Sequence, residues 1–239
     1  MYKKNFPSKK SRLVKGVLST ITAAYVFILT SCAGVGFISS AQSGFDKGLA
    51  FFNAGKYEEA IPRFRRATEL DPNFGRAYLY LGRSYLNLDR WSEAVAPLRT
   101  AYRLSPGETK KEIANLLLDA LFGAAIYEYN KGNFQDSASF LREVLQVEPN
   151  SSRARSDLAR TLIALGGALL SQGRSGDAIS TYNEALKLSP NNLDAYLGLA
   201  NAFLSNGDIL KALTVIETAI KIDPTNREAH SLFREMRRK

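Results

Sequence analysis

The segment GLAFFNAGKYEEAIPRFRRATELDPN, residues 48–73, sets the period of this chain. Residues 82–107, GRSYLNLDRWSEAVAPLRTAYRLSPG, align with it residue for residue at an offset of 34. Five prolines mark the ends of successive segments of this kind: Pro72, Pro106, Pro149, Pro190 and Pro224. A period of this length is typical of stacked pairs of helices, and proline ends a helix because it lacks the amide that continues the hydrogen-bond ladder. The sequence therefore predicts an all-α fold built from helical hairpins.

Four positions within the period carry the same kind of residue in all five segments. The eighth is small, as Gly48, Gly82, Ala125, Gly166 and Ala200, and so is the twentieth, as Ala60, Ala94, Ser137, Ala178 and Ala212. The twenty-fourth is large, as Phe64, Leu98, Leu141, Tyr182 and Ile216, and the twenty-seventh is Ala67, Ala101, Val144, Ala185 and Ala219. Small residues let two antiparallel helices approach closely, and large residues fill the space that remains.

This pattern resembles the tetratricopeptide repeat over residues 41–226. The resemblance implies an all-α, right-handed superhelical solenoid of five helix-turn-helix units and a C-terminal capping helix at 227–239. The expected units are 41–74, 75–108, 109–151, 152–192 and 193–226. A capping helix with a polar outer face keeps the end of a solenoid soluble, so Ala229, Leu232 and Met236 are expected to face the last unit.

Units three and four depart from the regular length. The marker prolines are 34, 43, 41 and 34 residues apart, and the longer units contain helix-like segments at 109–130 and 151–171. We expect the first helix of both units to be longer by about two turns. Unit three also has Glu128 where a large apolar residue is usual, so Tyr127 or Tyr129 is expected to fill that space.

The amino terminus has the layout of a secretory signal, in which basic residues, an apolar segment at 17–29 and small residues follow one another. The segment LTSC, residues 29–32, resembles the lipobox of bacterial lipoproteins. In that family the cysteine carries diacylglycerol, the signal is cut before it and the new amino terminus is acylated. The resemblance implies a signal peptide at 1–31, lipidation of Cys32 and a short tether at 32–40. Two or more acyl chains hold a protein firmly on a bilayer.

An uncleaved membrane helix stays open as an alternative, because no charged residue occurs from Gly16 to Phe45. That length is sufficient to span a bilayer. Both alternatives export the repeats and fasten them to a membrane. The lipoprotein would be anchored in the outer membrane of the cell envelope and face the periplasm, whereas the alternative is an inner-membrane anchor with periplasmic repeats.

Charge and composition exclude several other functions. The formal net charge is +9, but the amino-terminal segment alone contributes six positive charges: Lys3, Lys4, Lys9, Lys10, Arg12 and Lys15. Nucleic acid is therefore not the expected partner. The only histidine is His230, which leaves no paired-histidine metal site, zinc motif or catalytic triad, and there is no phosphate-binding glycine loop. We expect no enzyme activity, no metal and no cofactor.

The remaining expectation is protein binding on the concave surface that the first helices of such repeats form. The resemblance places the fifth, twelfth and thirteenth positions of each unit there. The candidate groove residues are Phe45, Leu79, Phe122, Ile163 and Leu197 at the fifth, Phe52, Leu86, Tyr129, Leu170 and Leu204 at the twelfth, and Asn53, Asn87 and Asn130 at the thirteenth. Apolar pockets would take side chains of an extended or helical partner, and the amides would bond its backbone. The alternative is that the apolar rows pack neighbouring helices and asparagine merely suits a helix end.

These expectations combine into a membrane-anchored, non-catalytic adaptor or assembly factor of a cell-envelope complex. It resembles the tetratricopeptide lipoproteins that assist outer-membrane protein insertion or the assembly of pili and secretion machinery. The alternative is an inner-membrane accessory protein of polysaccharide or protein export.

Overall fold

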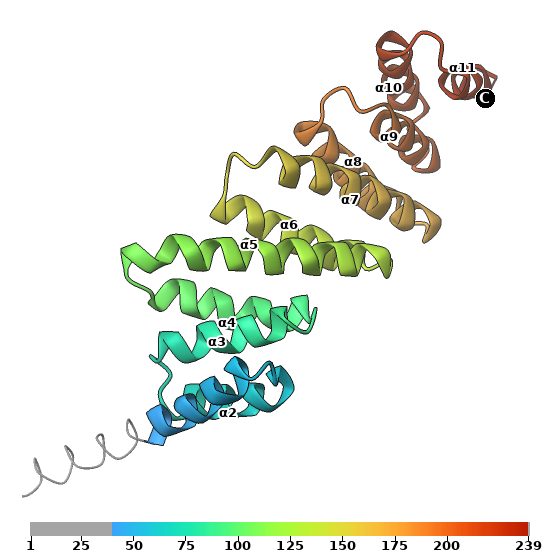
Figure 1. Ribbon diagram of the computed structural model, residues 1–239. Helices are drawn as coiled ribbons and strands as arrows, with labels where there is room; N and C mark the ends of the chain where they lie inside the picture. The colour runs from blue at the N-terminus through green and yellow to red at the C-terminus, as the bar shows by residue number, and fades with distance from the viewer. Residues whose placement is uncertain (1–39, 239) are drawn as a thin grey trace, which may run out of the picture. The chain divides into compact units, whose positions relative to one another are not determined.

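The computed structural model describes residues 40–238, whose regular secondary structure is entirely helical (Figure 1). Residues 40–53 form one helix. The helices that follow are α2 (Tyr57–Leu70), α3 (Gly75–Leu86), α4 (Trp91–Leu104), α5 (Gly107–Asn130), α6 (Phe134–Val147), α7 (Ser152–Ser171), α8 (Ser175–Leu188), α9 (Leu193–Ser205), α10 (Ile209–Ile222) and α11 (Arg227–Met236). The all-α, repeat-based fold expected from the sequence is confirmed.

The chain divides into two compact bodies. Among the described residues, the N-terminal body contains residues 40–88 together with Pro97–Pro106, and the C-terminal body contains Asp89–Ala96 and residues 107–238. Helix α4 therefore contributes to both. Within the C-terminal body, α5 to α11 follow one another in chain order, and each packs on the next (Figure 1).

The ends of the helices follow from single residues. Each marker proline lies two residues beyond the last residue of a second helix, as Pro72 does after Leu70. The turn inside each hairpin has a residue with positive φ at its third position: Gly55, Asp89, Gly132, Gly173 and Gly207. Glycine adopts this left-handed conformation without steric cost, which explains why four of the five turns contain it.

Close packing within a hairpin depends on the small residue at the eighth position. A Cβ atom added to Gly82 would lie 2.4 Å from Cγ of Leu98, and one added to Gly48 would lie 2.7 Å from Cε1 of Phe64. The large residue at the twenty-fourth position therefore fills the space that glycine leaves, as the repeat pattern predicts.

The first helices of the third and fourth hairpins are long. Helix α5 has 24 residues and α7 has 20, whereas α3 has 12 and α9 has 13. At the start of α7 the Ser151 hydroxyl accepts a hydrogen bond from the amide of Ala154, which caps the helix. The hairpins α5/α6 and α7/α8 therefore carry additional helical surface, which bears on the candidate site.

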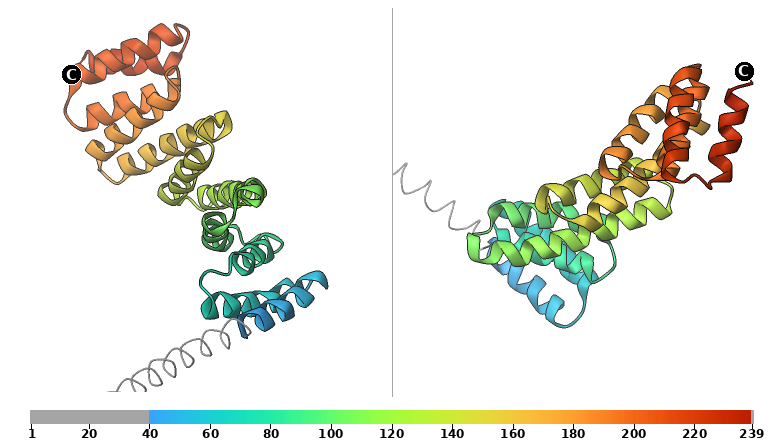
Figure 2. Two further views of the ribbon diagram at one scale, coloured as in Figure 1. Left: turned by 90° about the vertical axis from the view of Figure 1, so that its left-hand side faces the viewer. Right: turned by 90° about the horizontal axis from the view of Figure 1, so that it is seen from above.

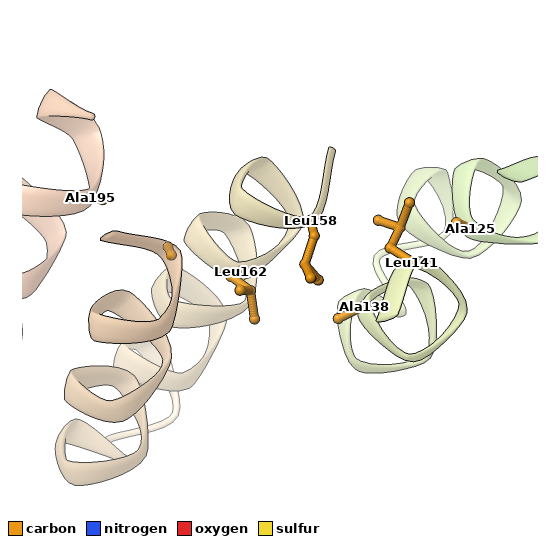
Figure 3. Packing of buried hydrophobic residues seen from close by; sticks show 7 residues of the cluster. Ala125, Ala138, Leu141, Leu158, Leu162 and Ala195 are labelled. Atoms are coloured by element: carbon orange, nitrogen blue, oxygen red, sulfur yellow. The ribbon is translucent and has the colours of Figure 1, made fainter. Parts of the chain in front are cut away.

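Clusters of buried apolar residues join the hairpins of the C-terminal body. Leu158 and Leu162 of α7 lie between the residues of α6 on one side and Ala195 of α9 on the other (Figure 3). Leu162 exposes none of its surface and Leu158 exposes 2%. Helix α11 extends this mode of packing, because Ala229 and Met236 are buried in the cluster that contains Ile216, and Leu232 packs against it. Figure 2 shows α11, which ends at the label C, beside the last hairpin. The contacts expected of the capping helix are confirmed.

The structure shows which tyrosine beside Glu128 fills the space inside the third hairpin, a choice that the sequence left open. The ring of Tyr129 packs at 5.2 Å from that of Phe134 and is partly buried. Tyr127 exposes 50% of its surface, and Lys131 lies 5.0 Å above its ring. Tyr129, not Tyr127, therefore fills the space inside the hairpin.

Tyr182 is expected to make folding sensitive to alkaline pH. Burial raises the pKa of its hydroxyl above the ordinary value, because the phenolate is poorly solvated. The unfolded chain then loses this proton first, so the stabilisation is complete below about pH 10 and is lost as the pH rises through the folded-state pKa. Urea unfolding at about pH 8 and about pH 10.5 should show a smaller loss of stability in Tyr182→Phe than in the wild type. Equal losses would contradict the assignment.

Candidate functional site

The fifth-position residues differ in how much they are covered. Phe45 exposes 1% of its surface and Leu197 exposes 6%, so these two side chains belong to the core. Phe45 packs against Phe64, Phe74 and Tyr80, at ring distances of 5.6, 5.0 and 5.6 Å. Leu79, Phe122 and Ile163 are only partly buried. The fifth row therefore mixes core residues with residues that a ligand can reach.

The twelfth-position residues are all partly buried: Phe52, Leu86, Tyr129, Leu170 and Leu204. Phe52 lies 5.2 Å from the ring of Tyr80 in the next hairpin. Leu170 and Leu204 pack against the apolar clusters of the C-terminal body. Packing between neighbouring first helices accounts for part of this row, which is the alternative that the sequence left open.

The thirteenth-position residues Asn53, Asn87 and Asn130 are exposed at the ends of their helices. The amide of Asn87 donates a hydrogen bond to the carbonyl oxygen of Arg83 at 2.8 Å, so it serves its own helix end. Asn130 has a different setting, because it borders a hollow.

Two hollows lie along α7 in the C-terminal body. The smaller is bordered by α5 and α6, and the larger mainly by the end of α8, the connection after it and the start of α9. The larger measures about 700 Å³ and the smaller about 330 Å³. They adjoin, because Tyr129 and Arg160 line both. Of the candidate groove residues, Tyr129, Asn130 and Ile163 line these hollows. The sequence thus placed three of its candidates together, at the junction of the third and fourth hairpins.

Charged side chains of α7 border the same hollows. Arg160 forms an ion pair with Asp157, and Arg153 approaches the other carboxylate oxygen of Asp157 at 3.7 Å. The guanidinium of Arg153 also lies 4.3 Å above the ring of Phe122. Arg155 lines the larger hollow and donates to the carbonyl oxygen of Asn150 at 3.2 Å.

Sequence reasoning missed several residues of these hollows. Ile126 lines the smaller hollow and exposes 49% of its surface, and Ser137 lines it with a buried hydroxyl that has no hydrogen-bond partner. The serine at the twentieth position, where the other four repeats have alanine, was the available signal for Ser137. No repeat position pointed to the arginines of α7, because they lie partly in the extra length of that helix.

The described part of the chain contains no group of three His, Cys, Asp or Glu side chains that could hold a metal ion. His230, in the first turn of α11, hydrogen-bonds through Nε2 to the carbonyl oxygen of Pro224 at 2.9 Å, in the loop before the helix. Among residues 40–238, no helix has the length and apolar character needed to cross a membrane. Cys32, the expected signal peptide at 1–31 and nearly all of the expected tether at 32–40 lie outside the described residues.

Comparison with known proteins places the fold in a family. Residues 45–109 and residues 169–234 match two profiles that are both described as tetratricopeptide repeat. The crystal structure of a TPR repeats protein from Bacteroides fragilis is similar, with a TM-score of 0.52 and 15% identity, over 83% of this chain and 98% of that one.

Similar curated proteins are much longer than this chain. Mouse sperm-associated antigen 1 is 31% identical over 123 residues, which are 52% of this chain and 12% of that protein. Mouse protein O-mannosyl-transferase TMTC3 is 30% identical over 155 residues, 64% of this chain and 16% of that protein. Anaphase-promoting complex subunit 6 of Arabidopsis thaliana is 27% identical over 187 residues, 68% of this chain and 34% of that protein. The repeats, rather than any whole protein, are what is shared, and the chain belongs to the tetratricopeptide repeat family.

Proposed function

We propose that this chain is a non-catalytic scaffold that holds a segment of a partner protein against the first helices of its repeats. Tetratricopeptide repeat proteins mediate protein–protein interactions, and their fold is typically non-catalytic. The transferase activity in the name of TMTC3 belongs to a protein of which this chain matches 16%, so it does not support an enzyme here.

The adjoining hollows along α7 carry this proposal. A binding site for a protein segment needs concave surface with apolar and polar groups side by side. The hollows offer about 700 and about 330 Å³, the half-exposed side chain of Ile126, the ring of Tyr129 and the exposed amide of Asn130. A peptide side chain can fill the hollow while the amide of Asn130 bonds the peptide backbone.

Photo-crosslinking from single positions tests the scaffold. A photoreactive amino acid is placed at Asn130 or at Asn183, an exposed asparagine of α8 that lines neither hollow. In cells that make the full chain, we expect position 130 to yield a discrete crosslinked protein and position 183 to yield none. No product at position 130, or the same product at both positions, would contradict the proposal.

The scaffold is further proposed to be a lipoprotein of the bacterial cell envelope, anchored through acyl chains on Cys32 and facing the periplasm from the outer membrane. The support is the segment LTSC at 29–32 after a basic and apolar leader. In this role it would be an adaptor or assembly factor for an outer-membrane, pilus or secretion complex. The uncharged run from Gly16 to Phe45 favours a second candidate, an inner-membrane accessory protein with an uncleaved anchor.

The intact mass of the membrane-extracted protein separates these two anchors. We expect the wild type to have the mass of residues 32–239 plus acyl chains, and Cys32→Ala to lose the acyl mass, because the thiol is the site of attachment. The unmodified full-length mass in both proteins would refute lipidation and support the uncleaved helix. Neither result bears on partner binding, which the crosslinking experiment tests.

A further inference from the structure

We infer that the segment bound at the two hollows is acidic, and that the arginines of α7 which border the hollows select it. This inference rests on the proposed function, because it specifies the partner of the same surface. It depends on four observations: the origin of two of the arginines, the charge balance around the hollows, the contacts that orient the arginines, and an unpartnered hydroxyl beside them.

Two of the three arginines come from a part of α7 that the regular repeats lack. Gly166 of α7 and Ala200 of α9 occupy the same repeat position, so residue 159 corresponds to Leu193, the first residue of α9. The residues from Ser152 to Leu158 are therefore additional helix, and they include Arg153 and Arg155. The two marker prolines of this unit are 41 residues apart instead of 34, which reflects the same insertion. The presence of Arg153 and Arg155 at the hollows is thus a feature of this chain rather than of the repeat, whereas Arg160 lies at a regular repeat position.

The charges around the hollows favour an anionic ligand. Three arginines border them, Arg153, Arg155 and Arg160, against two carboxylates, Asp157 and Asp194. Arg153 and Arg160 share the single carboxylate of Asp157, and their side chains still expose 63% and 64% of their surface. Each guanidinium has five N–H donors, so it can bind a second carboxylate without leaving Asp157. Asp157 balances only one of the two positive charges of Arg153 and Arg160, and a carboxylate of the ligand would balance the other.

Two of the arginines have contacts that orient them before a ligand arrives. The guanidinium of Arg153 stacks 4.3 Å from the ring of Phe122, and Arg155 donates to the carbonyl oxygen of Asn150. Side chains that are ordered in advance lose less conformational entropy when they bind. Arginine presents a flat pair of donors that matches a carboxylate, which makes Asp and Glu side chains the fitting ligands.

Ser137 supplies an independent sign of a ligand. It exposes 1% of its surface, lines the smaller hollow, and its Oγ has no hydrogen-bond partner in the described structure. Alanine occupies the equivalent position in the other four repeats, so packing alone does not need the hydroxyl. An unpartnered buried hydroxyl is unfavourable, and a bound segment that brought an acceptor oxygen into the hollow would satisfy it.

Apolar surface next to the arginines favours an apolar residue beside the acidic residue of the bound segment. Ile126 and Tyr129 line the smaller hollow together with Arg153 and Arg160. The expected ligand is therefore an acidic side chain followed or preceded closely by an apolar one, rather than a run of carboxylates alone.

An array of immobilised ten-residue peptides tests the inference. Each position is fixed in turn as one of the twenty amino acids or phosphoserine, with the others degenerate, and the full chain is applied in detergent. We expect selection of Asp or Glu beside an apolar residue, and about tenfold weaker binding for Arg160→Gln, because a charge-assisted hydrogen bond is lost. Asp157→Asn should strengthen binding, because it removes a negative charge beside the hollows and with it the repulsion of an acidic ligand.

Arg174→Gln is the matched control, because Arg174 also pairs with an aspartate three residues away and is exposed, but lines neither hollow. It should leave binding unchanged. Ser137→Ala should weaken binding while raising Tm by about 2–4 °C, because the unpartnered hydroxyl is gone. Absence of acidic selection, selection of phosphoserine over Glu, or equal effects of Arg160→Gln and Arg174→Gln would overturn the inference. Such a result, with a crosslinked partner still found at Asn130, would leave the scaffold standing.

Discussion

Leu162→Ala is expected to lower the free energy of unfolding by about 2–5 kcal/mol. Leu162 is completely buried in the cluster that joins α5, α6, α7, α8 and α9 (Figure 3). Its truncation removes apolar contacts and leaves a cavity, and the neighbours on both sides belong to different hairpins. In a repeat protein each hairpin is stabilised by its neighbours, so the loss is felt across the C-terminal body. Urea unfolding followed by far-UV circular dichroism measures the change.

Leu210→Ala is the matched control, because it makes the same chemical change on a helix. Leu210 exposes 82% of its surface at the start of α10, so its truncation should change the free energy of unfolding by no more than about 0.5 kcal/mol. Similar destabilisation by the two substitutions would show that the buried cluster is not what holds these hairpins together.

Gly198→Ala is expected to destabilise the protein by about 1–3 kcal/mol, although alanine favours helix formation over glycine. A Cβ atom at Gly198 would lie 2.3 Å from Cζ and 2.6 Å from Oη of Tyr182. The ring is also packed closely against Gly166 of α7, where an added Cβ would lie 2.7 Å from the same Cζ. It therefore cannot move toward α7 to make room for a side chain at Gly198. Tyr182 is thus confined between α7 and α9, and its displacement must move a helix.

Two further variants isolate the cause. Gly167→Ala changes a neighbouring helical glycine, but its Cβ would lie an ordinary 3.7 Å from Oη of Tyr182, so we expect a gain of about 0.5–1 kcal/mol. Leucine occupies the repeat position of Tyr182 in two other units, as Leu98 and Leu141. In the double variant, Tyr182→Leu should therefore abolish most of the destabilisation caused by Gly198→Ala. If Gly198→Ala stabilised the chain as Gly167→Ala does, the confinement of Tyr182 would be refuted.

The helices could be predicted from the sequence because their ends depend on local chemistry. Pro72 and its equivalents end the second helices, and the glycines of positive φ make the hairpin turns. The contact of Gly82 with Leu98 could be predicted as well, because both residues lie in one hairpin at a fixed offset. Packing inside a hairpin is thus encoded at short range.

Contacts between hairpins were harder to predict, because they depend on how one helix is rotated against the next. The close approach of Gly198 to Tyr182 joins successive repeats and has no signature at a single repeat position. For the same reason Phe45 was assigned to a groove, whereas rings from the second hairpin cover it.

The candidate site was predictable only where it follows the regular repeat. Tyr129, Asn130 and Ile163 occupy standard positions and line the hollows. Arg153 and Arg155 lie in the inserted turns of α7, for which the repeat offers no template. The inserted arginines distinguish this chain from a regular repeat protein, and the repeat pattern could not predict them.

Amide hydrogen exchange of the full chain, alone and with the partner captured at position 130, tests most directly whether the first helices hold the partner. The account predicts slower exchange in residues 126–130 at the end of α5 and in residues 153–160 of α7, because a bound segment covers the hollows there and opposes local opening. Unchanged exchange in both segments, with slowing confined to α10, would contradict it.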